Sequence, residues 1–232
     1  VIEGWTDPNE TKLEGPFGDH YGFYSLPGNY PVLHVTAITH RRNAVLPATI
    51  VGQPPMEDGY LGEAVGAQLT PVVRFQHRDL RSLYLPLETG FHNLAIVSAK
   101  QRYPRQGRKT ALGLLGAGQM MLMKTVMVID EDEDPHDLEV FLDALNNKVN
   151  PSEDIITIEG LPGDSLDPAN PFENVQSKIL VDATSIPTND PRYGEDSPLV
   201  SPSKRSPEWR LTGVYAPGVP DDFDQLVVQE GL

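Results

Sequence analysis

The sequence predicts an α/β fold, and two patterns along the chain indicate it. Short runs rich in β-branched residues alternate with segments of helical periodicity through the middle of the chain. Strands that alternate with helices of about 10–15 residues are typical of a sheet with parallel members, so we expect a largely parallel sheet. The alternation stops after residue 184. Residues 185–232 hold seven of the 22 prolines, which predicts an extended Pro-rich tail.

In the first part of the chain we expect mainly β structure. Residues 1–5 (Val-Ile-Glu-Gly-Trp) are typical of a strand that ends in a turn. Residues 31–40 begin with proline and are rich in β-branched residues, which predicts a strand. A second short strand is expected at 48–52. The Gln53-Pro54-Pro55 break that follows is the best candidate for a domain boundary.

The second part shows the alternating pattern. A helix is expected at 56–68, with Thr70 and Pro71 able to cap it and start a further turn. Asp134 followed by Pro135 gives the clearest helix start, with Asp as the N-cap and Pro at the first helical position. The other expected elements are strands at 80–87, 93–99, 125–129, 155–158 and 179–181, a helix at 109–120, and a short helix in the tail at 221–229.

Composition limits the kinds of partner that the chain can have. Its 232 residues carry 18 Lys+Arg against 33 Asp+Glu, which gives a formal net charge of −15. Such a charge opposes binding to nucleic acid or to an anionic membrane surface. No apolar run of about 18 residues is present to span a membrane. The absence of cysteine excludes thiolate chemistry and fits the cytoplasmic setting that we expect.

The segment 14–20 (Glu-Gly-Pro-Phe-Gly-Asp-His) carries the strongest chemical signal. The Gly-Pro-Phe-Gly sequence favours a tight turn, which can hold Glu14 and Asp19 towards one pocket. In such a pair one carboxyl can stay protonated as a general acid while the other stays ionised. The alternative is a polar turn with incidental acids, and the pattern alone favours that alternative.

Histidine spacing predicts no metal site. His34 and His40 share one face of a predicted strand but lie about 20 Å apart, too far for one ion. His77, His92 and His136 have no neighbouring ligand pattern, so surface or packing roles are expected for them.

Two charged clusters each allow a binding role and a structural one. The acidic run 130–134 has oxygen ligands for a hard cation, but a solvated turn that favours a helix N-terminus fits it better. A basic cluster surrounds Tyr103 and can grip a phosphate, although salt bridges between subunits are favoured. Its members are Lys100, Arg102, Arg105, Arg108 and Lys109.

Motifs of the common nucleotide enzymes and hydrolases are missing. The glycines of 113–118 have the wrong order for a dinucleotide fingerprint, and no phosphate loop or Gly-x-Ser-x-Gly elbow occurs. Ordinary NAD and ATP enzymes are therefore disfavoured.

Several longer segments together match one known family. They are 14–24, 35–41, 52–58, 91–98, 100–104, 118–120, 130–137, 177–178 and 182–184. Through these segments the chain resembles the UbiD family of reversible decarboxylases, in order from its first residue to about residue 184.

The resemblance implies a function and a set of cofactors. Members use prenylated FMN, with Mn²⁺ or Mg²⁺ and K⁺, to decarboxylate aromatic or α,β-unsaturated carboxylic acids, or to add CO₂ to the product. Their catalytic set is an arginine and two acids, and the acids match Glu14 and Asp19. By this resemblance Asp19 would exchange a proton with the carbon that loses CO₂. Glu14 would pair with the arginine.

The resemblance also implies a division of the chain. Residues 1–54 would form the end of a split β-barrel flavin-binding domain, 55–184 an α/β oligomerisation domain, and 185–232 the tail. The arginine and the residues that hold flavin and metal would lie mainly upstream, so no metal ligand is expected within this chain.

We therefore expect a carboxy-lyase that is inactive without an N-terminal half or a companion subunit, and that forms a homo- or hetero-oligomer. A non-catalytic assembly subunit is the alternative. A carboxylate-rich cation-binding domain is a third possibility, which rests on the acidic run alone.

Overall fold

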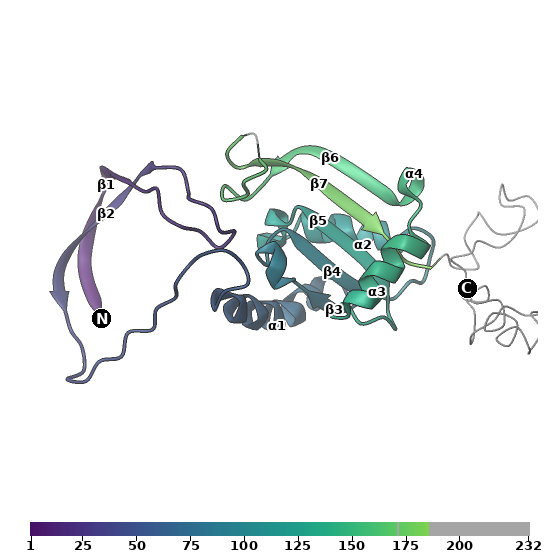
Figure 1. Cartoon of the computed structure of the whole chain (residues 1–232), viewed down its shortest axis with the longest axis horizontal. Helices are drawn as coiled ribbons and strands as arrows, with labels where there is room; N and C mark the ends of the chain where they lie inside the picture. The colour runs from purple at the N-terminus through teal and green to yellow at the C-terminus, as the bar shows by residue number, and fades with distance from the viewer. Residues whose placement is uncertain (171, 186–232) are drawn as a thin grey trace, which may run out of the picture.

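The computed structural model describes residues 1–170 and 172–185, and it confirms the expected α/β fold class. A two-stranded ribbon is followed by a long connection and then by an α/β domain (Figure 1). The loop between the two ribbon strands reaches towards the α/β domain. The helix expected at 221–229 and nearly all of the predicted tail lie outside the described residues.

The ribbon consists of β1 (Ile2–Glu14) and β2 (Gly28–Ile38), which pair in antiparallel fashion. β2 confirms the strand expected in this region. The turn expected after residue 5 is wrong, because the ladder with β2 keeps β1 extended. The turn-forming residues Pro8 and Asn9 instead fall in an irregular stretch between Thr6 and Thr11, where the register shifts.

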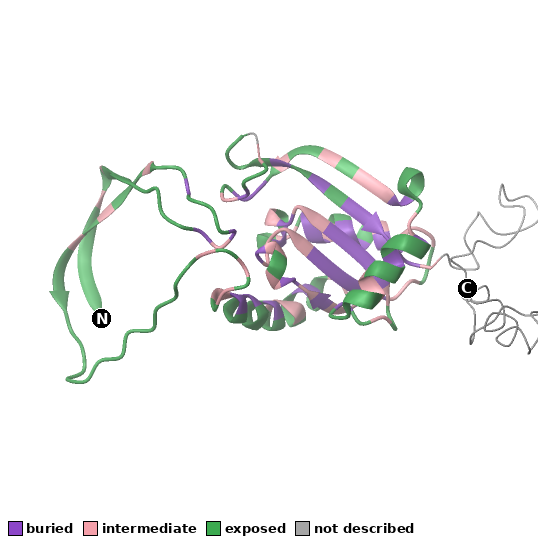
Figure 2. Ribbon diagram, viewed as in Figure 1, coloured by how far each residue is buried: buried purple, intermediate pink, exposed green. Residues whose placement is uncertain are grey.

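Both faces of the ribbon are largely exposed, as the green colouring of β1 and β2 in Figure 2 shows. An isolated two-stranded ribbon is marginally stable in water, and exposed apolar patches mark contact surfaces. The ribbon therefore presents apolar faces that the other described residues do not cover. Its exposed large apolar side chains include Ile2, Trp5, Leu13, Leu33, Val35 and Ile38.

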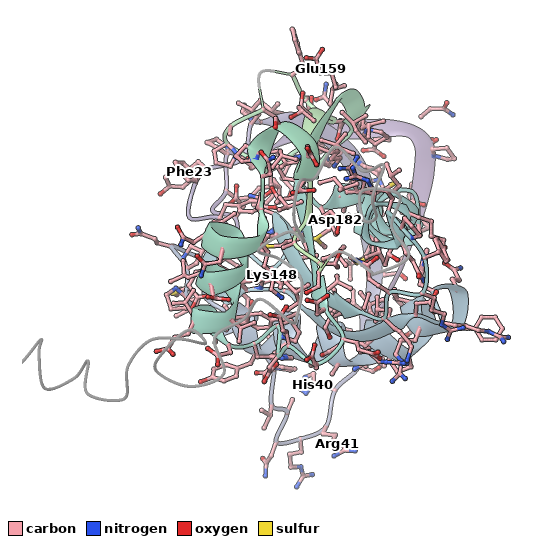
Figure 3. All side chains as sticks on the ribbon, turned by 90° about the vertical axis from the view of Figure 1, so that its right-hand side faces the viewer. Phe23, His40, Arg41, Lys148, Glu159 and Asp182 are labelled. Carbon is pink, nitrogen blue, oxygen red and sulfur yellow. The ribbon has the colours of Figure 1, made fainter. Side chains whose placement is uncertain are left out.

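The connection 39–57 is also exposed over most of its length. The strand expected at 48–52 is wrong, because these residues have no ladder partner within the described part of the chain. His40 and Arg41 lie on this connection and project from the body of the molecule (Figure 3).

The α/β domain is built on a five-stranded sheet in the order β3-β4-β5-β7-β6. The inner strands β4, β5 and β7 are parallel, whereas the edge strands β3 and β6 are antiparallel to their neighbours. The sheet is thus mixed and not largely parallel. Both antiparallel pairs are joined without an α-helical crossover, which parallel pairs require. The strands are β3 (Leu80–Tyr84), β4 (Leu94–Ala99), β5 (Thr125–Asp130), β6 (Ile155–Pro162) and β7 (Val175–Asp182).

Helices cover both faces of this sheet. α1 (Asp58–Gln76) and α2 (Gln106–Leu115) pack on one face, and α3 (Leu138–Asp143) with the π-helical turn η3 (Ala144–Lys148) packs on the other. Residues of β5 alternate between two cores: Val126 and Val128 pack beneath α2, and Met127 and Ile129 face α3. No helix of the described residues has the length and apolarity needed to cross a membrane.

Helix boundaries differ from the expected ones in α1 and α2. α1 continues through Pro71 to Gln76 as one helix. α2 (Gln106–Leu115) starts and ends earlier than the expected 109–120, and the 3-10 helix η2 (Gly118–Leu122) follows it. Two further short elements are η1 (Leu87–Thr89) and α4 (Pro151–Asp154).

The N-cap predicted for α3 is also wrong. Asp137 caps this helix, and its side chain accepts a hydrogen bond from the Glu139 amide at 2.9 Å. Asp134 instead accepts a hydrogen bond from the His136 amide at 3.0 Å and forms a local turn. The N-cap therefore lies three residues later in the chain than predicted.

Truncation of a core leucine tests the role of α2. Leu114 has 0% exposure beneath the sheet, whereas Leu112 on the same helix is 46% exposed. We expect Leu114→Ala to lower the free energy of unfolding in urea by about 2–5 kcal/mol, because it leaves a cavity. Leu112→Ala is the matched control and should change it by less than about 1 kcal/mol. Equal losses would contradict the packing of this helix.

Candidate active site

The loop between β1 and β2, residues 15–27, carries Asp19 and forms a small closed turn. The Asp19 amide donates to the Phe23 carbonyl at 2.9 Å, and the Ser25 amide donates to the Phe17 carbonyl at 2.8 Å. Gly22 has a positive φ of 84°, and a Cβ there would lie 2.7 Å from Cα of Gln53. The closed turn therefore lies at 19–23, after the Gly15–Gly18 stretch for which the sequence predicted it.

Asp19 is buried in this loop, with 3% exposure. Its Oδ1 accepts a hydrogen bond from the Tyr21 amide at 2.7 Å. The residue lines a cavity of about 300 Å³ together with aromatic and polar side chains, among them Phe23, Ser25, Asn170 and Phe172. Phe23 projects from the same loop in Figure 3. A carboxyl group is thus held at the wall of a cavity.

Glu14, the other acid of the predicted pair, has a different environment. It ends β1 opposite Gly28 and is exposed. The structure therefore buries one of the two acids and leaves the other on the open end of the ribbon.

Tyr21 joins the Asp19 loop to the α/β domain. Its hydroxyl donates to Oδ2 of Asp164, in the connection between β6 and β7, at 3.3 Å. Its ring packs against Gly90, where an added Cβ would lie 2.6 Å from the ring. Burial and the neighbouring Asp164 raise the pKa of Tyr21 well above its ordinary value, so the hydroxyl remains a hydrogen-bond donor.

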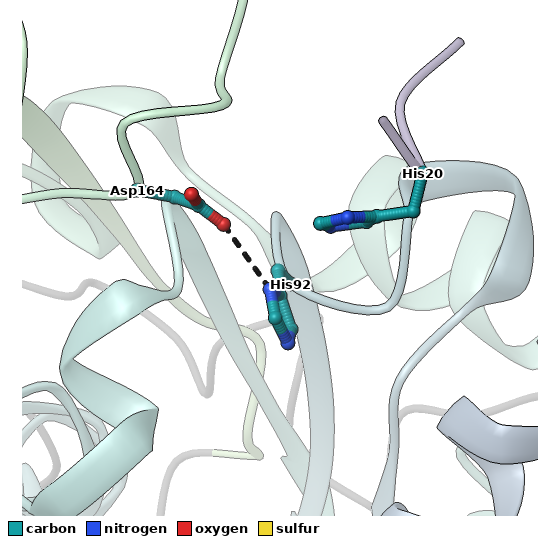
Figure 4. Close-up of side chains that lie close together, drawn as sticks. All are labelled: His20, His92 and Asp164. Carbon is teal, nitrogen blue, oxygen red and sulfur yellow. Dashed lines mark hydrogen bonds and ion pairs between the residues drawn. The ribbon is translucent and has the colours of Figure 1, made fainter. Parts of the chain in front are cut away.

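His20, His92 and Asp164 form a cluster beside Tyr21 (Figure 4). Nδ1 of His92 lies 3.1 Å from Oδ2 of Asp164, and the rings of His20 and His92 meet edge-on with centroids 5.0 Å apart. Burial, assisted by the nearby His92, lowers the pKa of His20 and favours its neutral ring.

Asp164 in this cluster stays ionised despite being buried. Burial acts to raise its pKa, but hydrogen bonds from His92 and from the Leu166 amide outweigh it and lower the pKa.

Sequence spacing did not reveal this cluster. Its members come from three segments: the ribbon loop, the β3–β4 connection and the β6–β7 connection. His92 lies 72 positions after His20, and Asp164 lies 72 positions after His92, so no local ligand pattern exists. The sequence predicted only a surface or packing role for His92, whereas in the structure His92 contacts both His20 and Asp164.

A buried polar network lies next to the cavity. Oδ2 of Asp167 accepts from Lys124 Nζ at 2.6 Å and from Gln176 Nε2 at 3.0 Å. Lys178, with 1% exposure, donates to Gln176 and to the Met121 carbonyl. Burial lowers the pKa of Lys178 to about 8.

The acidic run after β5 encloses a buried lysine. Lys148 Nζ lies 2.7 Å from Oδ2 of Asp130 and 2.6 Å from Oε1 of Glu133. Lys148 lies within the body of the domain in Figure 3. The favoured prediction of a solvated turn is thus incomplete, because two of the acids neutralise this lysine.

The basic cluster also pairs with acids of the same chain. Arg102 Nε lies 3.2 Å from Oδ1 of Asp79, and Lys100 Nζ lies 3.2 Å from Oε1 of Glu131. Arg105 and Arg108 both approach Oδ1 of Asp154, at 3.7 and 3.6 Å. These pairs stabilise one chain, whereas the sequence favoured salt bridges between subunits.

Comparison with protein families gives two matches that are consecutive along the chain. The Rift-related domain of 3-octaprenyl-4-hydroxybenzoate carboxy-lyase (UbiD) matches residues 1–54. The C-terminal domain of the same carboxy-lyase matches residues 59–183.

Relatives of the chain are considerably longer than the chain itself. Proteins of Archaeoglobus fulgidus and Aquifex aeolicus are each 42% identical to it, over 184 and 186 residues. These matches cover 79% and 80% of this chain but 38% of each relative. The chain therefore spans well under half the length of these curated relatives.

Solved structures that resemble this chain are also of longer chains. The closed form of vanillic acid decarboxylase from Sedimentibacter hydroxybenzoicus matches with a TM-score of 0.77 and 28% identity, over 99% of this chain and 44% of that chain. An evolved dimeric form of the UbiD-class enzyme HmfF from Pelotomaculum thermopropionicum, in complex with prFMN, matches with a TM-score of 0.57 and 25% identity. That match covers 84% of this chain and 41% of HmfF.

The buried lysine gives a prediction for alkaline pH. An unfolded lysine has a pKa of about 10.4, whereas the pKa of Lys178 is about 8. Between these two values the unfolded state binds more protons, so the free energy of unfolding rises with pH. From about pH 7 to pH 10 we expect the free energy of unfolding in urea to rise by up to roughly 3 kcal/mol more in wild type than in Lys178→Met.

Lys12→Met is the matched control, since Lys12 is exposed on the ribbon. Its free energy of unfolding relative to wild type gives the baseline for removal of an exposed ammonium group over the same pH range. A constant difference for Lys178→Met would show that the lysine is not desolvated.

Proposed function

The chain belongs to the UbiD family of carboxy-lyases, and from that premise we propose that it supplies part of the active site of a prenylated-FMN-dependent decarboxylase or carboxylase. The observation that carries the proposal is the burial of Asp19 at the wall of a cavity, on a loop fixed to the α/β domain. The proposed substrate is an aromatic or α,β-unsaturated carboxylic acid.

In this proposal Asp19 moves a proton to or from the carbon that carries the carboxylate. Loss of CO₂ leaves an electron pair on that carbon, and a bound prenylated flavin would serve as the electron sink. Asp19 then delivers the proton that completes decarboxylation, and removes it when the reaction runs towards carboxylation. The hydrogen bond from the Tyr21 amide orients the carboxyl group for this transfer.

The surroundings of Asp19 suit an aromatic reactant. Phe23, Tyr24 and Phe172 line the same cavity, and their rings offer faces for stacking against an unsaturated system. Restricted access of water to the buried carboxyl also protects the reacting carbon from competing proton exchange.

Glu14 has the second proposed role, that of pairing with a catalytic arginine. Its exposure at the end of β1 leaves its carboxylate available to a group from outside the described residues. The arginine, together with the residues that hold flavin, Mn²⁺ or Mg²⁺, and K⁺, would belong to another part of the assembly.

The proposed assembly explains the exposed ribbon. We assign residues 1–54 to the end of a flavin-binding split-barrel domain, 55–184 to an α/β oligomerisation domain and 185–232 to a tail. In this arrangement an N-terminal half or companion subunit covers the apolar faces of β1 and β2. The chain would be inactive without that polypeptide.

A second candidate is a non-catalytic assembly subunit of such a complex. It is favoured by a row of exposed apolar side chains on α1, which is suited to contact with another subunit. The row consists of Leu61, Val65, Val72 and Phe75. Asp19 distinguishes the two candidates, because assembly requires no buried acid at the cavity.

Asp19→Asn in the complete assembly tests the proposal. Asparagine retains the side-chain oxygen that accepts from the Tyr21 amide, but it cannot exchange a proton. We expect exchange of labelled CO₂ with the carboxylate to fall by at least about 100-fold.

Asp132→Asn provides the matched control, since Asp132 is exposed on the turn after β5. It should leave the exchange rate unchanged. An unchanged rate for Asp19→Asn in a correctly assembled, flavin-loaded complex would favour the assembly subunit.

A further inference from the structure

The His20–His92–Asp164 cluster is a second site, separate from the Glu14 and Asp19 pair. We propose that it binds one divalent cation that favours imidazole nitrogen, with Zn²⁺ as the best fit. The cation would join the ribbon loop to the two connections of the α/β domain on which His92 and Asp164 lie. This inference does not depend on the proposed decarboxylase activity.

The donor atoms already lie close to the arrangement that a cation requires. One ligand atom from each of the three residues lies within 4.8 Å of the other two. Ligands at about 2.1 Å from a tetrahedral ion are roughly 3.4 Å apart, so small side-chain rotations complete the site. Two imidazoles with one carboxylate suit Zn²⁺ better than Mg²⁺ or Ca²⁺, which prefer oxygen ligands.

His20 provides an independent indication that a ligand is needed. Its Nε2 atom is buried and has no hydrogen-bond partner within the described part of the chain. A buried nitrogen without a partner is unfavourable, because it has lost its hydration and gained nothing in return. In Figure 4 the His20 ring points towards the space beside His92 and Asp164, where a cation would satisfy it.

The charges around the cluster favour a cation. Besides Asp164, the carboxylates of Asp19 and Asp58 act on the His20 ring. Two further hydrogen bonds orient Asp164: Oδ1 accepts from the Leu166 amide at 3.0 Å, and Oδ2 accepts from the Tyr21 hydroxyl. Outer contacts of this kind fix a ligating carboxylate in position.

The position of the site suggests its effect. His20 follows Asp19 directly in the chain, so a cation held by His20 would fix the Asp19 loop against the α/β domain. With three protein ligands, water would complete the coordination of the ion. We therefore assign the cation a positioning role, outside the chemical step.

Metal titration of the untagged full-length chain, with any companion polypeptide retained, tests the inference. After treatment with a chelator, Zn²⁺ is added and binding is followed by calorimetry, while Co²⁺ is added separately to record its visible absorption. We expect wild type to bind one Zn²⁺, and Asp164→Asn and His92→Gln to bind it with affinity reduced by at least about tenfold. Wild type should also give the intense visible bands of four-coordinate Co²⁺.

Asp134→Asn and His136→Ala are the matched controls, because His136 and Asp134 form another His–Asp pair that is exposed and has no third ligand among the described residues. These controls should retain the bound Zn²⁺. Equal Zn²⁺ binding by wild type and Asp164→Asn, or Co²⁺ bands that persist in that variant, would overturn the inference. Because asparagine retains an acceptor for Tyr21, the thermal unfolding midpoint without metal reports whether the variant is folded.

Discussion

The attachment of one loop to the α/β domain is the constraint on which the candidate site depends. The loop belongs to an exposed ribbon, yet Tyr21 inserts its ring at Gly90 and bonds to Asp164. This contact brings the turn residues into a buried environment and thereby places Asp19 at the cavity wall. Without it, the acid would lie on a flexible connection between two exposed strands, with no fixed position relative to a substrate.

The two parts of the chain differ in how they are stabilised. The α/β domain has a core on each face of its sheet, with buried ion pairs such as that of Lys148 with Asp130. The ribbon has no comparable core within the described residues, and a ribbon of two strands alone is marginally stable in water. Asp19 lies where the ribbon loop meets the α/β domain.

Much of the α/β domain was predictable, because its strands are short runs of β-branched and aliphatic residues that alternate with helical segments. The predictions were wrong where local hydrogen bonds or strand pairing determine the structure. Asp137, and not Asp134, caps α3. Residues 48–52 do not form the expected strand, because no described strand pairs with them. The burial of Asp19 required knowledge of the Tyr21 contact, which joins residues 143 positions apart. Nothing in sequence spacing signals such a contact.

Amide hydrogen exchange at Tyr21 measures whether the α/β domain holds the Asp19 loop. We expect this amide, bonded to Asp19, to exchange much more slowly than amides of the exposed connection 39–57. We also expect Tyr21→Phe, which removes the bond to Asp164, to speed exchange at this position. Exchange in wild type as fast as in the connection would contradict the claim that the Asp19 loop is held by the α/β domain.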